Sequence, residues 1–300
     1  MRSVPHLTTE SEVAVEMPAI ERRGLKKGLS LIPSAFTAAN IGMGFFAVMA
    51  ALRGFQLVGN GGEDEMLRAA GHFDNAARAI GWAMLFDMLD GRIARMTKTA
   101  TELGVQLDSL ADVLTFGIAP AVLAYAWGYG SALRDGSDLH KLGWFLSFMY
   151  LMCGVFRLAR FNVQAARPRI LAEGTPKLDK KNFIGLPIPA AAALIAAIIH
   201  FAPKPLIEYE PRLAILYSCL LMALVGCLSA LMVSTLRYSS FKSIGTRRRS
   251  TRRMILLIAS IGMLVWLYSR YVLLILIATY VLYGPLARLA TLFRRRPERE

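Results

Sequence analysis

Long apolar runs separated by short charged segments dominate this chain. The runs are nearly free of charge and occupy residues 31–51, 113–127, 144–155, 186–202, 213–236 and 254–283. Because a helix needs roughly 20 mainly apolar residues to cross the hydrocarbon core of a bilayer, the runs predict membrane-spanning helices. We place these helices at residues 31–53, 73–95, 106–128, 142–160, 186–202, 212–236, 254–269 and 271–290.

The last apolar run permits two interpretations. It is long for one helix and short for two, and Arg270 is its only charged residue. One tilted helix would give seven spans and would put the C-terminus on the outer side. Two short spans would keep the basic C-terminal residues beside the other basic loops. We therefore expect an all-α polytopic membrane protein with a six-helix core, a C-terminal hairpin and about eight spans.

This pattern also gives the expected organisation of the chain. Residues 1–28 are polar and of mixed charge, which favours a flexible cytosolic tail. The remaining segments are the transmembrane core at 29–243, a basic cytosolic loop at 244–253, the hairpin at 254–293 and a basic tail at 294–300.

The distribution of charge predicts the orientation. The chain has 35 Lys and Arg against 21 Asp and Glu, for a net charge of +14. Most basic residues fall in the two tails and near residues 92–98, 157–181 and 237–253, which all lie on one side of the predicted helices. Since basic loops stay in the cytoplasm, both termini and the 92–98 turn are expected there. The apolar content of 55% favours this membrane explanation over nucleic-acid binding, and no nucleic-acid partner is expected.

Four aspartates lie in or beside apolar sequence in the second and third predicted helices. Asp87 and Asp90 share one helical face, and Asp108 and Asp112, four residues apart, share another. Carboxylates at membrane depth are costly, and divalent cations such as Mg²⁺ or Mn²⁺ compensate them because these ions prefer oxygen ligands. A short turn makes the two helices antiparallel neighbours, so all four acids are expected around one site near the cytoplasmic end.

Small residues and one arginine accompany the acids. Gly91, Ala94 and Gly104 leave room for a phosphate and a nucleotide, and Arg95 offers a planar fork for phosphate oxygens. A single acid could instead be satisfied by an ion pair with a neighbouring arginine. Four acids interleaved with three small residues favour two metals that assist displacement at phosphorus.

These positions match the signature D-x2-D-G-x2-A-R-x8-G-x3-D-x3-D, and the chain thereby resembles the CDP-alcohol phosphotransferases. Members of that family move a phosphoalcohol group from a CDP-linked donor to an acceptor hydroxyl and release CMP. The resemblance implies that Asp87, Asp90 and Asp108 bind two divalent metals, Mg²⁺ or Mn²⁺. It implies that Asp112 is the general base and can also contact metal. The residues implied at the CDP moiety are Gly91, Ala94, Arg95 and Gly104.

Further stretches are similar to the phosphatidylserine synthase branch of this family, at residues 106–121, 156–163, 183–193 and 232–242. The 31–45 stretch is similar too, although Ser34 stands where an asparagine is expected. This similarity implies that the substrates are CDP-diacylglycerol and L-serine. It also implies a bacterial-type inner membrane and a homodimer, and the basic loops predict an active site that faces the cytoplasm.

Two other groups of residues are candidates for binding. Arg157, Arg160 and Asn162 follow the fourth predicted helix and suit a serine carboxylate or a donor phosphate, as an acceptor and phosphate pocket. The two arginines could equally be anchors on the cytoplasmic side. Thr37 and Asn40 could line the nucleotide site or could serve helix packing.

The sequence also contains weaker candidates for binding residues. Arg237, Tyr238 and Lys242 are weaker candidates for substrate binding, and the basic run at 247–253 favours contact with anionic lipid.

The nearest alternative function keeps the same chemistry with another acceptor. Choline would need an aromatic cage, and glycerol 3-phosphate or an inositol compound would need more cationic groups. An ion or metal transporter would distribute its acids along a path through the membrane, whereas these acids cluster at one side.

Overall fold

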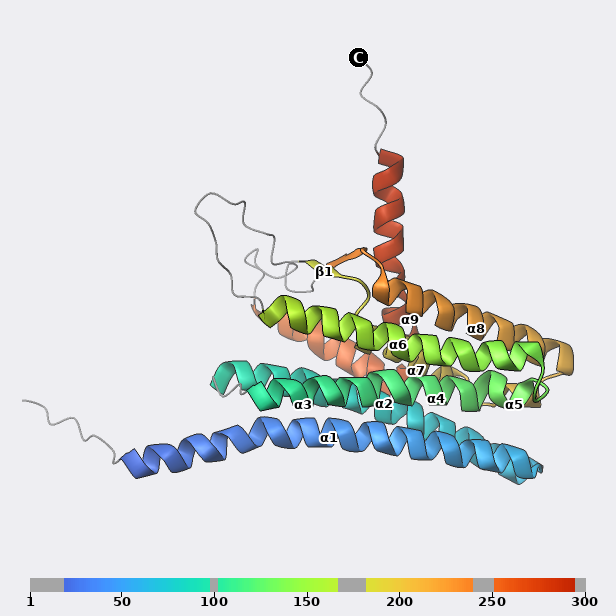
Figure 1. Ribbon diagram of the computed structural model, residues 1–300, viewed down its shortest axis with the longest axis horizontal. Helices are drawn as coiled ribbons and strands as arrows, with labels where there is room; N and C mark the ends of the chain where they lie inside the picture. Colours follow the sequence, from blue (N-terminus) through green and yellow to red (C-terminus); the bar gives the residue numbers. More distant parts are fainter. Residues whose placement is uncertain (1–18, 98–101, 167–181, 240–250, 295–300) are drawn as a thin grey trace, which may run out of the picture.

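Helices make up nearly all of the described chain, as the apolar pattern predicts. The computed structural model describes residues 19–97, 102–166, 182–239 and 251–294. Figure 1 shows helices running side by side along the long axis of the molecule. The long helices are α1 (Ala19–Asn60), α2 (Glu63–Thr97), α6 (Asp138–Ala166), α7 (Ile188–Phe201), α8 (Pro211–Val233) and α9 (Thr251–Arg294). Helix α1 begins at Ala19, so residues 19–28 of the expected tail are helical, and the cytosolic tail at 1–28 stays a prediction.

The third predicted span is a composite helix that contains two π-helical stretches. Its consecutive parts are α3 (Glu102–Asp112), η1 (Val113–Ile118), α4 (Ala119–Ala124), η2 (Tyr125–Tyr129) and α5 (Gly130–Ala132). Pro120 has no N–H with which to bond the Phe116 carbonyl four residues earlier, and that carbonyl accepts a hydrogen bond from the Tyr150 hydroxyl at 3.1 Å. The first π-helical stretch begins directly after Asp112. Such stretches occur often at functional sites.

Six helical segments in the described part of the chain are long and apolar enough to cross a membrane. They are Ala35–Asn60, Gly104–Ala132, Asp138–Val163, Ile188–Glu208, Pro211–Val233 and Gly262–Arg288. The expectation of an all-α polytopic membrane protein is confirmed. Helix α2, expected to span at 73–95, is not among the six, because charged residues interrupt its apolar sequence.

Helix α2 packs against its neighbours along one face. It packs along α1, where a Cβ on Gly54 would lie 2.8 Å from the Phe73 ring. Phe73, Ile80 and Ala83 are completely buried. A small residue at position 54 therefore lets the two helices approach closely. The Asp74 and Asp90 side chains of α2 are also buried.

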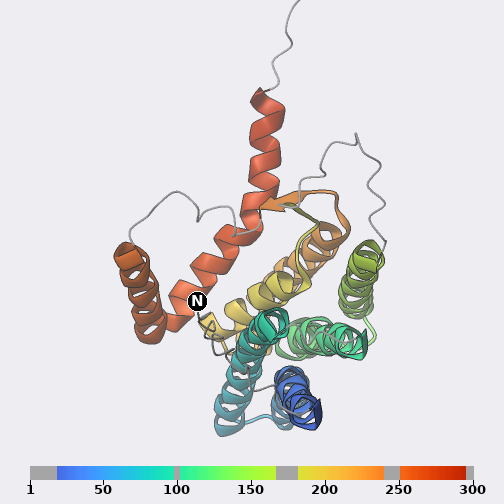
Figure 2. The same cartoon turned by 90° about the vertical axis from the view of Figure 1, so that its left-hand side faces the viewer.

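The C-terminal apolar run forms one element with a bend. Helical geometry breaks once in α9, at Tyr268 (φ −132°, ψ 43°). The break between two helices was expected at Arg270, two residues later. Figure 2 shows the two legs diverging from the bend, and the second leg crosses the bundle instead of running along it. Only the segment Gly262–Arg288 meets the criteria for a span in this region. The count of about eight spans stays a prediction.

Two short strands, which the all-helical expectation did not include, join the start of α7 to the end of α8. Strands β1 (Asn182–Ile184) and β2 (Arg237–Ser239) pair antiparallel. Gly185 follows β1 with φ +81°, and its N–H donates to the Leu236 carbonyl at 2.8 Å. A Cβ at this position would collide with the Met232 carbonyl, so the turn favours glycine. The side chains of Arg237 and Tyr238, together with Lys242 and residues 247–250, lie outside the described residues.

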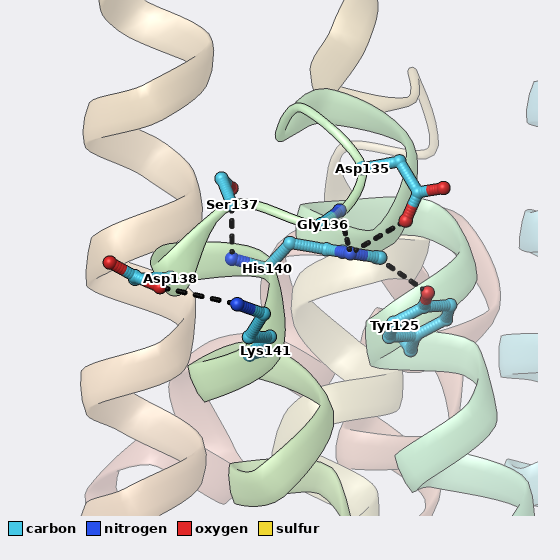
Figure 3. A network of polar contacts seen from close by, with 7 residues as sticks. All are labelled: Tyr125, Asp135, Gly136, Ser137, Asp138, His140 and Lys141. Carbon is cyan, nitrogen blue, oxygen red and sulfur yellow. Dashed lines mark hydrogen bonds and ion pairs between the residues drawn. The ribbon is translucent and has the colours of Figure 1, made fainter.

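At the opposite end of the bundle, a polar network fixes the turn between α5 and α6 (Figure 3). The Tyr125 hydroxyl and the His140 Nε2 lie 2.7 Å apart, and Asp135 lies 3.1 Å from the His140 Nδ1. The His140 N–H donates to the Ser137 hydroxyl at 3.2 Å. The network caps the first turn of α6, which extends towards the aspartates.

Candidate active site

Three of the four signature aspartates meet at one place. Asp87 comes from α2, and Asp108 and Asp112 come from α3. One carboxylate oxygen of each lies within 4.8 Å of the others, and all three residues are partly buried. Three facing carboxylates form a set of hard oxygen ligands of the kind that Mg²⁺ and Mn²⁺ prefer. The cluster could therefore bind a metal ion.

Asp90 lies beside this cluster and not in it. It is buried, with 6% of its surface exposed, and accepts a hydrogen bond from the Thr37 hydroxyl of α1. Its charge nevertheless interacts with those of Asp87 and Asp108. The four acids are thus one electrostatic unit, but Asp90 is held by α1 and the other three face one another.

The described residues leave part of the aspartate cluster without a hydrogen-bond partner. The Oδ1 of Asp112 is buried and has no hydrogen-bond partner there. Like charges held this close repel one another, and burial strengthens the repulsion. A cation between the carboxylates would relieve both problems, so the residues present fit a divalent metal.

The residues expected at the CDP moiety flank the cluster. Gly91 in α2 and Gly104 in α3 are both partly buried. The backbone of Ala94 and Arg95 belongs to α2, but their side chains lie outside the described residues. The role of all four in binding CDP stays a prediction.

Helix α1 supplies two polar side chains to the same region. The Thr37 hydroxyl donates a hydrogen bond to Asp90, as described above. Asn40 is completely buried, and neither its Oδ1 nor its Nδ2 has a hydrogen-bond partner among the described residues. The Thr115 hydroxyl donates to the Asn40 backbone carbonyl at 3.1 Å. A buried amide without partners costs about 1–3 kcal/mol. This favours a ligand role for the Asn40 side chain over simple packing.

The structure separates the three residues of the predicted acceptor pocket. Arg157 is partly buried, its Nε has no hydrogen-bond partner among the described residues, and its guanidinium interacts electrostatically with Asp112. Arg160 is exposed. Asn162 donates from Nδ2 to the Ser109 hydroxyl at 2.8 Å, which ties α6 to α3. Arg157 is thus the residue of the three whose charge interacts with the aspartate cluster.

Two residues near the site were not identified from the sequence. Ser109 adjoins Asp108 and links it to α6 through Asn162, a contact that no local pattern reveals. Tyr280, from α9, interacts electrostatically with Arg157. Its separation of more than a hundred residues from the other site residues leaves no spacing signal that could have found it.

The arrangement agrees with what the chain is similar to. CDP-diacylglycerol–serine O-phosphatidyltransferases from two organisms illustrate the similarity. The Helicobacter pylori protein is 29% identical over 256 residues, covering 85% of this chain and 90% of that protein. The Saccharomyces cerevisiae protein is 36% identical over 164 residues, covering 55% and 51%. The profile of the CDP-alcohol phosphatidyltransferase family matches residues 30–225. The chain belongs to the CDP-alcohol phosphatidyltransferase family.

Proposed function

We propose that this protein is a CDP-diacylglycerol–serine O-phosphatidyltransferase, which transfers a phosphatidyl group to the hydroxyl of L-serine and releases CMP. The observation that carries the proposal is the convergence of Asp87, Asp108 and Asp112 from helices α2 and α3. The full signature, the family and the names of similar proteins support the same reaction.

Asp87, Asp90 and Asp108 would hold two divalent ions, Mg²⁺ or Mn²⁺. When bound, these ions would neutralise the diphosphate and stabilise the CMP leaving group. The Thr37 hydroxyl would fix the orientation of Asp90 through its hydrogen bond. Gly91, Ala94, Arg95 and Gly104 would line the CDP moiety. The Asn40 amide, which has no hydrogen-bond partner in the described part of the chain, would bond a polar group of the nucleotide.

Asp112 is the proposed general base. Its unbonded Oδ1 can accept the proton of the serine hydroxyl. The serine oxygen then forms a bond to the phosphatidyl phosphorus, and the bond between that phosphorus and the CMP oxygen breaks, with the electron pair leaving on CMP.

Arg157 is the proposed anchor for a substrate anion. A guanidinium can bind the serine carboxylate or a donor phosphate through two parallel hydrogen bonds, and the Nε of Arg157 is available for one of them. Asn162 would position this part of α6 through Ser109. Arg160, being exposed, would contribute less.

We expect Arg157→Ala to raise the KM for serine or for CDP-diacylglycerol by about 10- to 100-fold, because a charge-assisted hydrogen bond is worth about 1.5–3 kcal/mol. Arg160→Ala should have a smaller effect. Arg212→Ala, at an exposed arginine near the start of α8, is the control. Steady-state kinetics with each substrate varied in turn measure these constants, and two KM values unchanged in Arg157→Ala would contradict the role.

The orientation and assembly also belong to the proposal. The acidic residues Glu63, Asp135 and Glu208 lie in the turns at the end away from the aspartate cluster. Since the basic segments adjoin, in the sequence, the helix ends nearer the aspartates, the positive-inside rule supports an active site that faces the cytoplasm of a bacterial-type inner membrane. The homodimer rests on resemblance alone.

The decisive test is an acceptor panel. Purified protein with Mn²⁺ or Mg²⁺ and CDP-diacylglycerol is given serine, choline, glycerol 3-phosphate or inositol, and CMP release is measured. We expect release only with serine. Release with another acceptor but not with serine would change the assigned substrate, and no metal-dependent release with any acceptor would contradict the family reaction and leave transport as the alternative.

A further inference from the structure

An apolar pocket lies between three of the membrane spans, at the end of the bundle away from the aspartates. It has a volume of about 390 Å³ and is lined by residues of η2, α7, α8 and the short 3₁₀ helix η3 (Leu206–Glu208). Trp127, Leu206 and Leu221 form its floor and are almost completely buried. Pockets of roughly 300–1,000 Å³ with apolar and aromatic walls are typical of sites for small ligands.

The pocket opens where the protein faces the bilayer. Phe201, Tyr217 and Leu220 also line it, and all three are exposed, Leu220 by 57%. They belong to the spans Ile188–Glu208 and Pro211–Val233. Since spans lie in the hydrocarbon core, the exposed surface of these residues meets acyl chains once the protein is in a membrane. An acyl chain is therefore the apolar group that can enter from this side.

The pocket is remote from the candidate active site. Figure 1 places α3, which carries Asp108 and Asp112, and α5, which closely follows Trp127, at opposite ends of the bundle. Trp127 comes 15 residues after Asp112 along the same composite helix, a distance of roughly 20 Å at about 1.5 Å per residue. A donor lipid with its phosphate at the aspartates thus has its headgroup on the other side of the bilayer from this pocket.

A charged pair stands at the rim of the pocket. The Lys204 carbonyl accepts a hydrogen bond from the Trp127 indole N–H at 3.0 Å, which ties the Lys204 backbone to the pocket floor. The Lys204 Nζ lies 5.3 Å from the centre of the Tyr209 ring, another lining residue, and 3.1 Å from a Glu208 carboxylate oxygen. Since Trp and Tyr concentrate at the level of the lipid headgroups, the rim lies where a phospholipid carries its charges.

This pair matches a headgroup that carries both charges. Both side chains are partly exposed, 47% for Lys204 and 36% for Glu208. A phosphate can accept a hydrogen bond from Lys204, and an ammonium can donate one to Glu208. A headgroup that carries only the phosphate would be repelled by Glu208. The rim therefore favours a zwitterionic phospholipid over an anionic one.

We propose that this pocket binds one acyl chain of a zwitterionic phospholipid from the leaflet opposite the active site, with the lipid phosphate at Lys204 and the lipid ammonium at Glu208. The acyl chain fills the cavity beside Trp127. The rings of Tyr209 and Tyr217, which lie edge-on with centroids 5.4 Å apart, border it. The site takes no part in the transfer reaction, so it stands or falls independently of the proposed acceptor.

The first test places a lipid at Trp127. Three of the four tryptophans, Trp82, Trp144 and Trp266, are exposed, whereas Trp127 is buried. The variant with Phe at those three positions is titrated in detergent with phosphatidylethanolamine that carries bromine on its acyl chains, because bromine quenches tryptophan fluorescence on contact. Quenching should saturate at about one lipid per protein. In the control that keeps Trp144 alone, quenching should rise steadily with the lipid fraction.

The second test closes the mouth with a matched pair of substitutions. Leu220→Trp adds a bulky ring at a residue that lines the pocket, and Leu216→Trp adds the same ring at an exposed leucine one turn earlier in α8 that does not. The amount of phosphatidylethanolamine that gives half of the maximal rise in Tm is measured for each. It should increase by about tenfold or more in Leu220→Trp, because each methylene kept out of the pocket is worth about fourfold in affinity. It should be unchanged in Leu216→Trp.

The third test identifies the headgroup. Phosphatidylethanolamine should bind the unmodified protein about 2- to 5-fold more tightly than phosphatidylglycerol with the same acyl chains, the range expected for an exposed ion pair. Glu208→Gln removes the repulsion of the anionic lipid and should abolish most of this preference. Glu210→Gln, at an exposed acid two residues later, is the control and should keep it.

Each test has a result that overturns the proposal. Quenching of Trp127 that rises like that of Trp144 would show that no lipid occupies the pocket. Equal half-saturation in Leu220→Trp and Leu216→Trp would place binding elsewhere, and equal binding of the two lipids would overturn the assignment of the headgroup. Loss of self-association in Leu220→Trp by light scattering, without saturable quenching, would assign the pocket to a contact with a second copy of the chain.

Discussion

Replacing Asp112 by asparagine is expected to lower kcat for CMP release by about 10²- to 10⁴-fold, the usual contribution of a positioned general base. Asparagine keeps the size of the side chain but cannot accept the serine proton. The buried Oδ1 of Asp112, without a hydrogen-bond partner among the described residues, is the atom whose basicity is lost.

The measurement is CMP release at saturating serine and CDP-diacylglycerol, with Mn²⁺ varied. Loss of kcat with little change in metal dependence would support a base, whereas a strongly raised metal requirement would show that Asp112 acts mainly as a ligand. Asp138→Asn is the control, because Asp138 is an exposed acid at the start of α6 that pairs only loosely with Lys141, at 3.4 Å. Activity near that of the control would refute the assignment.

Replacing Asp108 by asparagine should reduce activity by about 10³-fold at low metal concentration, because removing one charged ligand removes several kcal/mol of metal-dependent stabilisation. Asp108 is one of the three acids with oxygens within 4.8 Å. In contrast to Asp112→Asn, the loss should be partly reversed at high Mn²⁺, since added metal compensates for weaker binding.

Metal binding is checked without turnover by the thermal stability of the purified protein. Divalent metal should raise the Tm of the unmodified protein and should raise it less in Asp108→Asn, because a ligand that binds only the folded state stabilises it. Asp138→Asn should respond like the unmodified protein. An Asp108→Asn variant that is fully active at low metal and equally stabilised would contradict the metal site.

The expected losses follow from how the acids are arranged. Asp87, Asp108 and Asp112 face one another, so each depends on a cation to offset the charge of the other two. Asp90 has the Thr37 hydroxyl as a partner in addition. Thr37→Val should therefore weaken activity less than the loss of any acid, because it removes an orienting hydrogen bond and no charge.

Much of the fold could be predicted from the sequence, because the signals for spanning helices are local. Apolar runs of sufficient length identify helices wherever they occur, and α6 and α8 lie close to the predicted ranges. The spacing of Asp87, Asp108 and Asp112 likewise fixes which helix faces carry the acids, and few residues separate α2 from α3 in the sequence. Helical periodicity and this short separation were enough to predict that the three acids meet.

Contacts between distant segments could not be predicted in this way. Nothing in the sequence near Arg157 and Arg160 shows that one is partly buried beside Asp112 and the other exposed, because their difference depends on which neighbours cover α6. Strands β1 and β2 form only because the ends of α7 and α8 lie together.

The sequence by itself determined the membrane-embedded helices, the family signature and the helix faces on which the acids lie, since each follows from composition or from spacing within one segment. Only the tertiary structure decided that Thr37 holds Asp90, that the Asp74, His200 and Ser269 side chains meet, and that Arg157 is partly buried whereas Arg160 is exposed. The physical reason is that a side chain's partners depend on the packing of whole helices, which no local pattern specifies.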